Sequence, residues 1–336
     1  MSFIKGISSA FPEYFYKQED IIKLGRSLFS NNPHFNKMTK VYDNSGVKSR
    51  FLVNDIDWYR ENHNWKERNF LFKKNSISLL EKSIYSTLKK SFLKANQIGA
   101  IILVNTTGLA TPSIDAELIN LFNFSSDIKR LPIFGFGCAG GVLGLNRGVE
   151  IQKSIKKPVL VCNVELCSLT FRPQILSKEN IISTALFGDG ASSYVIDHEG
   201  ECKVLKSIDY TWKNSLDLMG WSVENDGLGV IFDKEIPKFI EDQLLKIVLK
   251  FFSINDKGFV LHSGGMKIIN AYKKIFKNHY TIKFSEEILS NYGNVSSVSV
   301  LLVLKKIIEN NIKGNFIMSA MGPGFSAGIS ELEINA

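Results

Sequence analysis

The 336-residue chain has no long apolar run and little cysteine. No apolar stretch reaches the ~18 residues that a membrane-spanning helix needs, and the first residues, MSFIKGISSAFPEYF, lack the apolar core of a secretory signal. We therefore expect a cytoplasmic protein without a membrane span. The four cysteines, none of them in a CxxC pair, argue against both a zinc site and a disulfide framework: Cys138, Cys162, Cys167 and Cys202.

The charge balance excludes few classes of protein, but its sign indicates which ligands are favoured. Apolar residues make up 44% and charged residues 22%, as in ordinary globular proteins, and the formal net charge is +8. This basic excess is spread through the chain, which fits an anionic substrate. There is no zinc finger, no RNP-type motif and no block of like charge, so we expect no nucleic-acid partner. A catalytically inactive basic binding module is the alternative from outside the enzymes.

One stretch contains a cysteine at a strand-to-helix corner. The apolar run 131–134 predicts a buried strand, the sequence GFGCAGG at 135–141 predicts a turn, and helical spacing returns over 142–151. Cys138 should therefore lie at a helix N-terminus, where free N–H groups and the helix dipole are expected to lower its pKa. The alternative is a buried structural cysteine in a tight corner.

The remaining chain alternates apolar strands with helices, apart from a mostly helical region at 13–85. Cys138 and Asn294 each begin a predicted helix after a glycine turn, and a strand follows each at about the same interval, which indicates an internal duplication. We expect parallel, doubly covered sheets in two halves, 1–199 and 200–336. If the halves face each other, His262 joins Cys138 and Asn294 at the strand ends.

These three residue types suit acyl transfer. A cysteine beside a histidine can form a thiolate–imidazolium pair, and histidine and asparagine N–H groups can together donate to one oxygen. The motifs contain no carboxylate base, which suits a carbanion formed by loss of CO₂. Each residue also has a structural alternative: His262 as a buried histidine, and Asn294 as a helix N-cap.

Basic residues gather near the N-terminus. Lys37 and Lys40 are expected on one helical face, and Lys48 and Arg50 follow after a turn. Such a cluster could bind the phosphates of a nucleotide-bearing substrate. A solvated basic face is the alternative.

The motifs together resemble the type III polyketide synthases, the chalcone and stilbene synthase family of the thiolase superfamily. The resemblance covers nearly the whole chain and implies a five-layered αβαβα fold of two pseudo-duplicated halves, active as a homodimer. Further segments, NTTGLATPS, ERN and DLMGW, resemble the bacterial alkylresorcinol and alkylpyrone synthases. The motifs that carry the family resemblance are GCAGG (137–141), VELCSLTFRP (164–173), ALFGDGASS (185–193), LHSGG (261–265), LSNYGNVSS (289–297) and MGPGFS (321–326).

The resemblance implies roles for individual residues. Cys138 matches the nucleophile that carries the acyl chain, and His262 and Asn294 match the pair that binds the thioester oxygen. Phe187 matches a gating phenylalanine at the tunnel mouth. The second gate is phenylalanine in the family but aligns with Val230 here, which should widen one wall and favour a fatty acyl starter.

The resemblance also implies contacts to coenzyme A and to the cavity. Lys37 and Lys40 match two phosphate contacts, and the third falls on Asn44. Other basic residues are expected to contribute to CoA binding: Lys48, Arg50 and Lys267. Residues of the cavity wall, the glycine-rich loop and the loop expected to cross the dimer interface are Cys167, Thr170, Gly322, Pro323, Gly324 and Thr111.

The expected reaction is iterative decarboxylative Claisen condensation of malonyl-CoA onto an acyl-CoA starter, with cyclisation to an alkylpyrone or alkylresorcinol. We expect no cofactor, since CoA thioesters are the substrates. The alternative among enzymes is a ketoacyl-synthase III-like protein, which shares the Cys, His and Asn set but condenses once.

Overall fold

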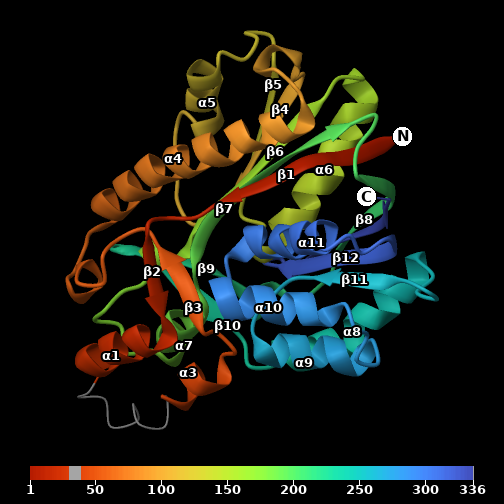
Figure 1. Cartoon of the computed structure of the whole chain (residues 1–336). Helices are drawn as coiled ribbons and strands as arrows, with labels where there is room; N and C mark the ends of the chain where they lie inside the picture. Colours follow the sequence, from red (N-terminus) through yellow and green to blue (C-terminus); the bar gives the residue numbers. More distant parts are fainter. Residues whose placement is uncertain (30–38, 336) are drawn as a thin grey trace.

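The computed structural model describes residues 1–29 and 39–335, and Figure 1 shows how its helices lie around a large central sheet. Lys37 lies outside the described residues. The strands are β1 (Ser2–Ala10), β2 (Tyr14–Lys17), β3 (Ser49–Leu52), β4 (Ala100–Asn105), β5 (Lys129–Phe134), β6 (Val159–Leu166), β7 (Asp189–Asp197), β8 (Cys202–Thr211), β9 (Met219–Glu224), β10 (Gly227–Phe232), β11 (Gly258–Leu261), β12 (Gly314–Gly322) and β13 (Ser326–Ile334).

Helices separate most of these strands. The α-helices are α1 (Gln18–Phe29), α3 (Lys40–Asn44), α4 (Trp65–Ser91), α5 (Ile114–Phe122), α6 (Gly140–Ile155), α7 (Lys178–Leu186), α8 (Ile236–Phe251), α9 (Met266–Ile275), α10 (Ile282–Tyr292) and α11 (Ser299–Glu309). Short 3-10 helices are η1 (Trp58–Arg60), η2 (Ala95–Gln97), η3 (Gly137–Ala139), η4 (Cys167–Thr170), η5 (Leu216–Leu218) and η6 (Ser296–Val298). Among the described helices, none is both long and apolar enough to cross a membrane.

The strand order of the nine-stranded sheet shows the internal duplication. Its strand order is β11-β12-β13-β8-β1-β7-β6-β4-β5. Counted outward from the junction between β1 and β8, the strands β1, β7, β6 and β4 of the first half correspond to β8, β13, β12 and β11 of the second. In each half the pair of these strands farthest from the junction is parallel and the other two pairs are antiparallel. The duplication predicted from the two helix starts is therefore confirmed by topology.

Three cores between these elements give five layers. Helices α4 and α5 pack on the outer face of the first half-sheet, and α8, α9 and α10 pack on the outer face of the second. Between the half-sheets, α6 and α11 form a central layer with apolar side chains from both halves. A fourth core joins α1, α7 and η1 at one end. The expected αβαβα fold is confirmed.

The two central helices approach closely because α6 is rich in glycine. A side chain at Gly141 would put a Cβ 2.3 Å from the carbonyl oxygen of Ser297 and 2.6 Å from Val300. The GCAGG turn and the GNVSS turn, which begin these helices, are thereby held against each other. This contact brings the two predicted site segments together.

Two expectations about the elements were wrong, and a third, the mostly helical region 13–85, was confirmed but incomplete. The sheet is mixed rather than parallel, because returning strands such as β7 and β13 run against their neighbours. The run 131–134 belongs to an edge strand, β5, in which Phe134 is 53% exposed, so its apolar character does not reflect burial. The region 13–85 also contains the antiparallel pair β2–β3, which short-range periodicity did not reveal.

Candidate active site

Cys138 lies in η3, between β5 and α6, as the sequence predicts. The preceding Gly137 has a positive φ of 48° and donates its N–H to the Thr106 hydroxyl at 2.9 Å. The Cys138 side chain is buried, 7% exposed, and its Sγ lies 3.7 Å from the Oγ of Ser296 in the second half. The turn therefore aims the sulfur across the contact between α6 and α11.

The predicted low pKa of Cys138 was wrong for the free protein. Burial raises the pKa of the thiol to about 12, and the nearby Glu165 adds to the rise. Hydrogen bonds with Ser296 and Asn294 offset only part of this rise in the pKa. Desolvation of the charged form outweighs the favourable position at the helix start, so the resting sulfur is a neutral thiol.

Asn294 is fixed through its backbone to the segment that carries Phe187. Its N–H donates to Leu186 O at 2.7 Å, and Gly188 N donates to Asn294 O at 3.0 Å. Gly293 permits this approach, because its φ is +69° and a Cβ there would lie 2.6 Å from Leu186 O. Backbone hydrogen bonds therefore tie Asn294 directly to the segment of the gate candidate, Phe187.

The amide of Asn294 is also oriented. Its Oδ1 accepts from Ser296 N at 2.9 Å, and its Nδ2 donates to Gly264 O at 3.2 Å. An amide nitrogen has two hydrogens, so one N–H remains, and a hydrogen bond from Asn294 lowers the pKa of Cys138. The second N–H of the Asn294 amide is therefore the donor on the side of the site where the Cys138 sulfur lies.

His262 follows β11 and is held by its backbone N–H, which donates to Ser319 O at 3.2 Å. The ring is buried, and within the described part of the chain neither of its nitrogens has a hydrogen-bond partner. Burial lowers the pKa of His262 to about 4, so the imidazole is neutral near pH 7 and carries one N–H. With Cys138 also neutral, the free protein does not hold the thiolate–imidazolium pair that these two residue types can form.

A carboxylate that the sequence reasoning missed lies beside the cysteine. Glu165 is fully buried in β6 and accepts hydrogen bonds from Thr106 N, Thr107 Oγ1 and Ser297 Oγ at 2.9–3.1 Å. Ser296 Oγ, which Cys138 contacts, is also 3.5 Å from Glu165 Oε1. Burial raises the pKa of this carboxyl to about 7. A charged residue inside the apolar run VLVCNVEL was the available signal.

The cavity at Cys138 is narrow and aromatic. Its other lining residues include Phe187, Trp221, Val230 and Phe232. Val230 lines the wall as predicted, but its cross-strand partner in the β9–β10 pair is Trp221. The Phe187 ring lies 6.1 Å from Trp221 and 5.7 Å from Phe232, between ring centroids. Aromatic rings therefore lie beside Val230 on this wall.

Comparison with known proteins now identifies the family. Models of the chalcone and stilbene synthases match residues 2–200 with their N-terminal domain and residues 212–330 with their C-terminal domain. The chain is 33% identical to a putative chalcone synthase of Bacillus subtilis (strain 168), over 97% of each protein. The chain belongs to the chalcone and stilbene synthase family. It is a type III polyketide synthase, and thus an acyltransferase.

Two further matches, one to a whole protein and one to a single domain, cover nearly all of this chain. The synthase is 27% identical to the 1,3,6,8-tetrahydroxynaphthalene synthase of Streptomyces coelicolor, over 96% of this chain and 90% of that protein. Its fold matches the crystal structure of the C-terminal type III polyketide synthase domain of Steely1 from Dictyostelium with a TM-score of 0.93, at 24% identity. That match covers 100% of this chain and 99% of the other.

The other residues predicted to line the cavity lie in different places in the structure. Pro323 lines the cavity at Cys138, where its ring would meet a Cβ at Gly137. Cys167 lines a different cavity, and Thr170, buried beside it in η4, donates to its carbonyl oxygen at 2.7 Å. Thr111 is exposed in the loop before α5 and lines neither cavity. Gly322 and Gly324 flank Pro323, and Gly324 has a φ of +123°.

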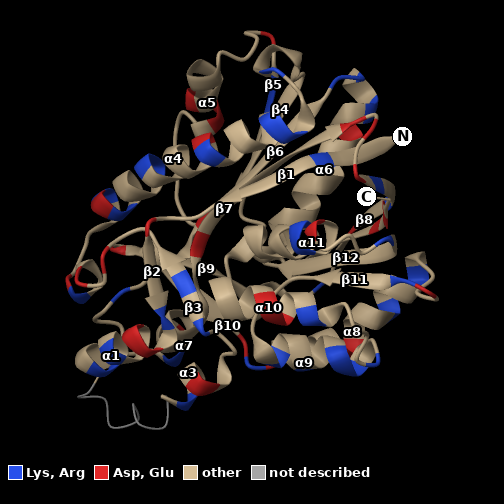
Figure 2. Cartoon of the chain, in the orientation of Figure 1, with Lys and Arg blue, Asp and Glu red and all other residues tan. Residues whose placement is uncertain are grey.

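Three of the lysines predicted to bind CoA are exposed. Lys40 begins α3, Lys48 precedes β3 and Lys267 is in the first turn of α9. Gly46 packs so closely on Met266 that an added Cβ would lie 2.3 Å from its Cγ, which brings the loop before Lys48 against the start of α9. Figure 2 shows basic residues on α3 and α9 at this end of the synthase.

Arg50 is not available to bind phosphate, contrary to the sequence prediction. Its side chain is 1% exposed, and its guanidinium donates to the backbone oxygens of Thr184, Ala185 and Phe187, each at 2.8 Å. It also donates to the side chain of Gln18. Arg50 therefore binds the C-terminus of α7, where carbonyl groups have no partner within the helix.

Proposed function

We propose that this synthase extends a fatty acyl starter by iterative decarboxylative condensation with malonyl-CoA. Cys138 carries the acyl chain, and His262 and Asn294 hold the reacting thioester oxygen. The observation that supports this assignment most directly is the contact between the turns that begin α6 and α11, the two helices related by the internal duplication. Cys138 begins α6, and Asn294 with Ser296 precedes α11, so nucleophile and amide donor face each other across Ser296.

The first step loads the starter. Because the free thiol has a pKa of about 12, its proton must leave as the sulfur attacks the acyl-CoA carbonyl. The neutral His262 can accept that proton. A carbon–sulfur bond to Cys138 forms, the bond to CoA breaks, and the proton passes to the departing CoA thiolate. Charge is conserved, and His262 returns to its neutral form.

The second step forms the new carbon–carbon bond. Malonyl-CoA loses CO₂, and N–H groups from His262 and Asn294 donate to the oxygen of the resulting enolate. The enolate carbon attacks the thioester on Cys138, the carbon–sulfur bond breaks, and the extended chain remains on CoA. Transfer of that chain back to Cys138 starts the next cycle. Cyclisation of the resulting poly-β-keto chain would give an alkylpyrone or alkylresorcinol.

The lining of the cavity supports an apolar starter. Phe187, Met219, Trp221, Val230 and Phe232 line the cavity with Cys138, and among the described residues no charged side chain lines it. A starter with a second carboxylate would lose hydration there without a cationic partner. An alkyl starter carries no such cost.

We propose that the activated thioesters need no further cofactor and that their CoA phosphates bind the exposed Lys40, Lys48 and Lys267. Because both substrates are CoA esters, the proposed reaction belongs in the cytoplasm. We also propose a homodimer, in which the exposed loop at Thr111 lies against the partner. Sedimentation of the purified synthase would measure this state directly.

The decisive experiment is an incubation with malonyl-CoA and acyl-CoAs of graded chain length, followed by liquid chromatography and mass spectrometry. Alkylpyrones or alkylresorcinols containing the starter would support the proposal. A product formed equally from malonyl-CoA alone would exclude a fatty starter, and a single condensation would exclude iteration. Cys138→Ala should abolish extension while retaining malonyl-CoA decarboxylation, since His262 and Asn294 remain.

A further inference from the structure

One wall of the cavity at Cys138 is a separate hairpin. Among the described strands, β9 and β10 pair only with each other and take no part in the nine-stranded sheet. Of the ten residues that line the cavity, the hairpin supplies five: Met219, Gly220, Trp221, Val230 and Phe232. The position of the hairpin on the rest of the molecule therefore decides how much space lies beside the sulfur.

The hairpin has one directed contact with the rest of the protein. It packs on the Phe187 ring through two aromatic side chains, but apolar contact has no preferred direction. Within the described part of the chain, a single ion pair joins residues 219–232 to other segments, and no further hydrogen bond does so. In this pair, Arg172 Nη1 lies 3.1 Å from Oδ1 of Asp226, in the turn of the hairpin. The ion pair is thus the contact that specifies where the turn lies.

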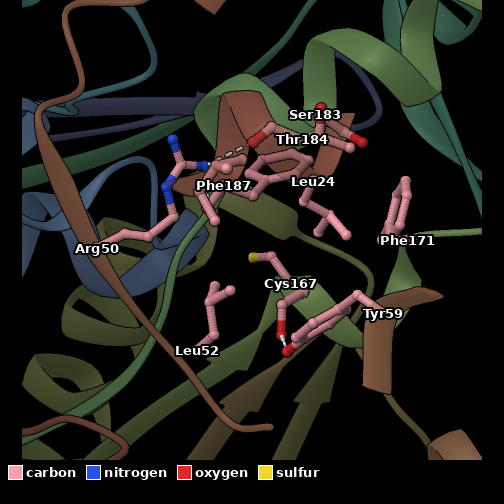
Figure 3. A pocket seen from close by; sticks show the side chains of 11 residues that line it. Leu24, Arg50, Leu52, Tyr59, Cys167, Phe171, Ser183, Thr184 and Phe187 are labelled. Carbon is pink, nitrogen blue, oxygen red and sulfur yellow. Dashed lines mark hydrogen bonds between the residues drawn. The ribbon is translucent and has the colours of Figure 1, made fainter. Parts of the chain in front are cut away.

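Arg172 is anchored in the segment between η4 and α7. Its backbone oxygen accepts hydrogen bonds from Asn180 Nδ2 at 2.8 Å and from Ile175 N at 3.1 Å. The preceding Phe171 is buried in the wall of the cavity that Cys167 also lines (Figure 3). The Arg172 side chain is 11% exposed, so it extends from a fixed backbone through the protein to the hairpin.

The guanidinium of Arg172 also lies against strand β10. A Cβ at Gly229 would be 2.7 Å from Arg172 Nη2, so the close approach requires glycine at this position. Gly229 directly precedes Val230, which lines the cavity. Arg172 therefore meets the hairpin at two places, the turn and the strand that carries part of the cavity wall.

Asp226 is the counter-ion of two arginines. A Cβ at Gly227 would lie 3.5 Å from Cδ of Arg68, so the turn also approaches this second guanidinium-bearing side chain, which is 2% exposed. Burial lowers the pKa of Arg68, Asp226 offsets part of that shift, and Arg172 adds to it. Glu67 makes a smaller contribution. Without the carboxylate of Asp226, two like charges would face the turn and their attraction for the hairpin would be lost.

We propose that Arg172 and Asp226 are positioning residues that limit how far the poly-β-keto chain is extended, by fixing the β9–β10 hairpin against the cavity at Cys138. This inference rests on the proposed iterative condensation. Neither residue lines the cavity, so both act through the hairpin and not on the substrate. When the ion pair is broken, the hairpin is held less closely, and the larger space beside the sulfur admits a chain with one more malonyl unit.

Asp226→Asn tests the proposal, because it removes the charge and keeps the size of the side chain. With malonyl-CoA and either palmitoyl-CoA or acetyl-CoA as starter, liquid chromatography and mass spectrometry give the ratio of products that differ by one malonyl unit. We expect this ratio to shift toward the longer product by about threefold or more. A partly unfolded sample would lower the yield of both products and leave their ratio unchanged, so the ratio separates positioning from a loss of stability.

The matched control is Glu224→Gln, which removes one negative charge from an exposed position of the same hairpin and should leave the ratio unchanged. Asp226→Glu keeps the carboxylate and should shift the ratio less than Asp226→Asn does. The double variant Arg172→Gln, Asp226→Asn should shift the ratio no further than Arg172→Gln alone, since the two residues act through one contact.

Two results would overturn the inference: a parental ratio in the folded Asp226→Asn protein, or additive shifts in the double variant. A failure of the proposed function looks different. A parental enzyme that forms only single-condensation products from both starters would refute iterative condensation itself.

Discussion

Arg50 donates a hydrogen bond to the backbone oxygen of Phe187 at 2.8 Å, although 137 positions separate the two residues in the chain. The same guanidinium binds Thr184 O and Ala185 O, so a buried cation holds the last turn of α7. A positive charge is favourable there, since the helix dipole is negative at its C-terminus. The gate candidate is thus positioned by a residue that the sequence suggested for CoA.

Replacing Arg50 with methionine should destabilise the synthase. Two buried carbonyl groups and one half-buried carbonyl group would lose their donor, which is expected to lower the free energy of unfolding by about 3 kcal/mol or more. Urea denaturation followed by circular dichroism measures this difference. Lys48→Met is the matched control and should change the value by less than about 0.5 kcal/mol, because Lys48 is exposed. Equal stabilities for the two variants would contradict the role of Arg50.

Alkylation of Cys138 should be slow at neutral pH and should accelerate with pH. Only the thiolate reacts, and a thiol whose pKa is raised to about 12 gains thiolate about tenfold per pH unit. Mass spectrometry of iodoacetamide adducts between pH 7 and pH 9.5 measures the rate at this site. Cys138→Ala identifies the adduct. A rate that is already constant at pH 7 would instead indicate a resting thiolate–imidazolium pair.

Glu165→Gln should change how stability depends on pH. The pKa of this carboxyl rises from 4.5 in the unfolded chain to about 7 in the folded protein, so the folded state holds the proton more tightly. The contribution of this carboxyl to the free energy of unfolding is fully present below about pH 4.5 and is lost as the pH rises through about 7. The loss is on the order of 3 kcal/mol.

Urea denaturation from pH 5 to pH 8 tests this prediction. The variant carries no titrating group at position 165. The free energy of unfolding of the parent should therefore fall relative to that of the variant as the pH rises. Thr107→Val serves as a control, because it removes one hydrogen bond to Glu165 but leaves the carboxyl in place. Parallel profiles for parent and Glu165→Gln would contradict the raised pKa.

Lys267→Glu should weaken the binding of malonyl-CoA without slowing the chemical step. An anion at the start of α9 would repel the CoA phosphates, so KM is expected to rise about tenfold at low salt, with kcat nearly unchanged. Lys246→Glu, which makes the same charge change on an exposed position of α8, should leave KM unaltered. Equal effects of the two substitutions would indicate a general charge effect and no phosphate site.

The sequence alone established the family, the internal duplication and the placement of Cys138 at a strand-to-helix corner. These features depend on short-range patterns: apolar runs, glycine turns and helical spacing that are complete within 20 or so residues. The approach of Cys138 to the Asn294 segment was also predictable, because two copies of one unit facing each other bring equivalent positions together.

Only the tertiary structure decided the electrostatics and the shape of the site. The pKa of Cys138 depends on how completely other segments exclude water from it, and Glu165 becomes part of the site through hydroxyl groups of the second half. Trp221 lies opposite Val230 across a strand pair, so the wall at this position depends on a residue nine positions away in the chain. Arg50 is a buried anchor rather than a surface cation because β3 carries it under α7. Desolvation and packing between distant segments are properties of the folded chain, and no local pattern contains them.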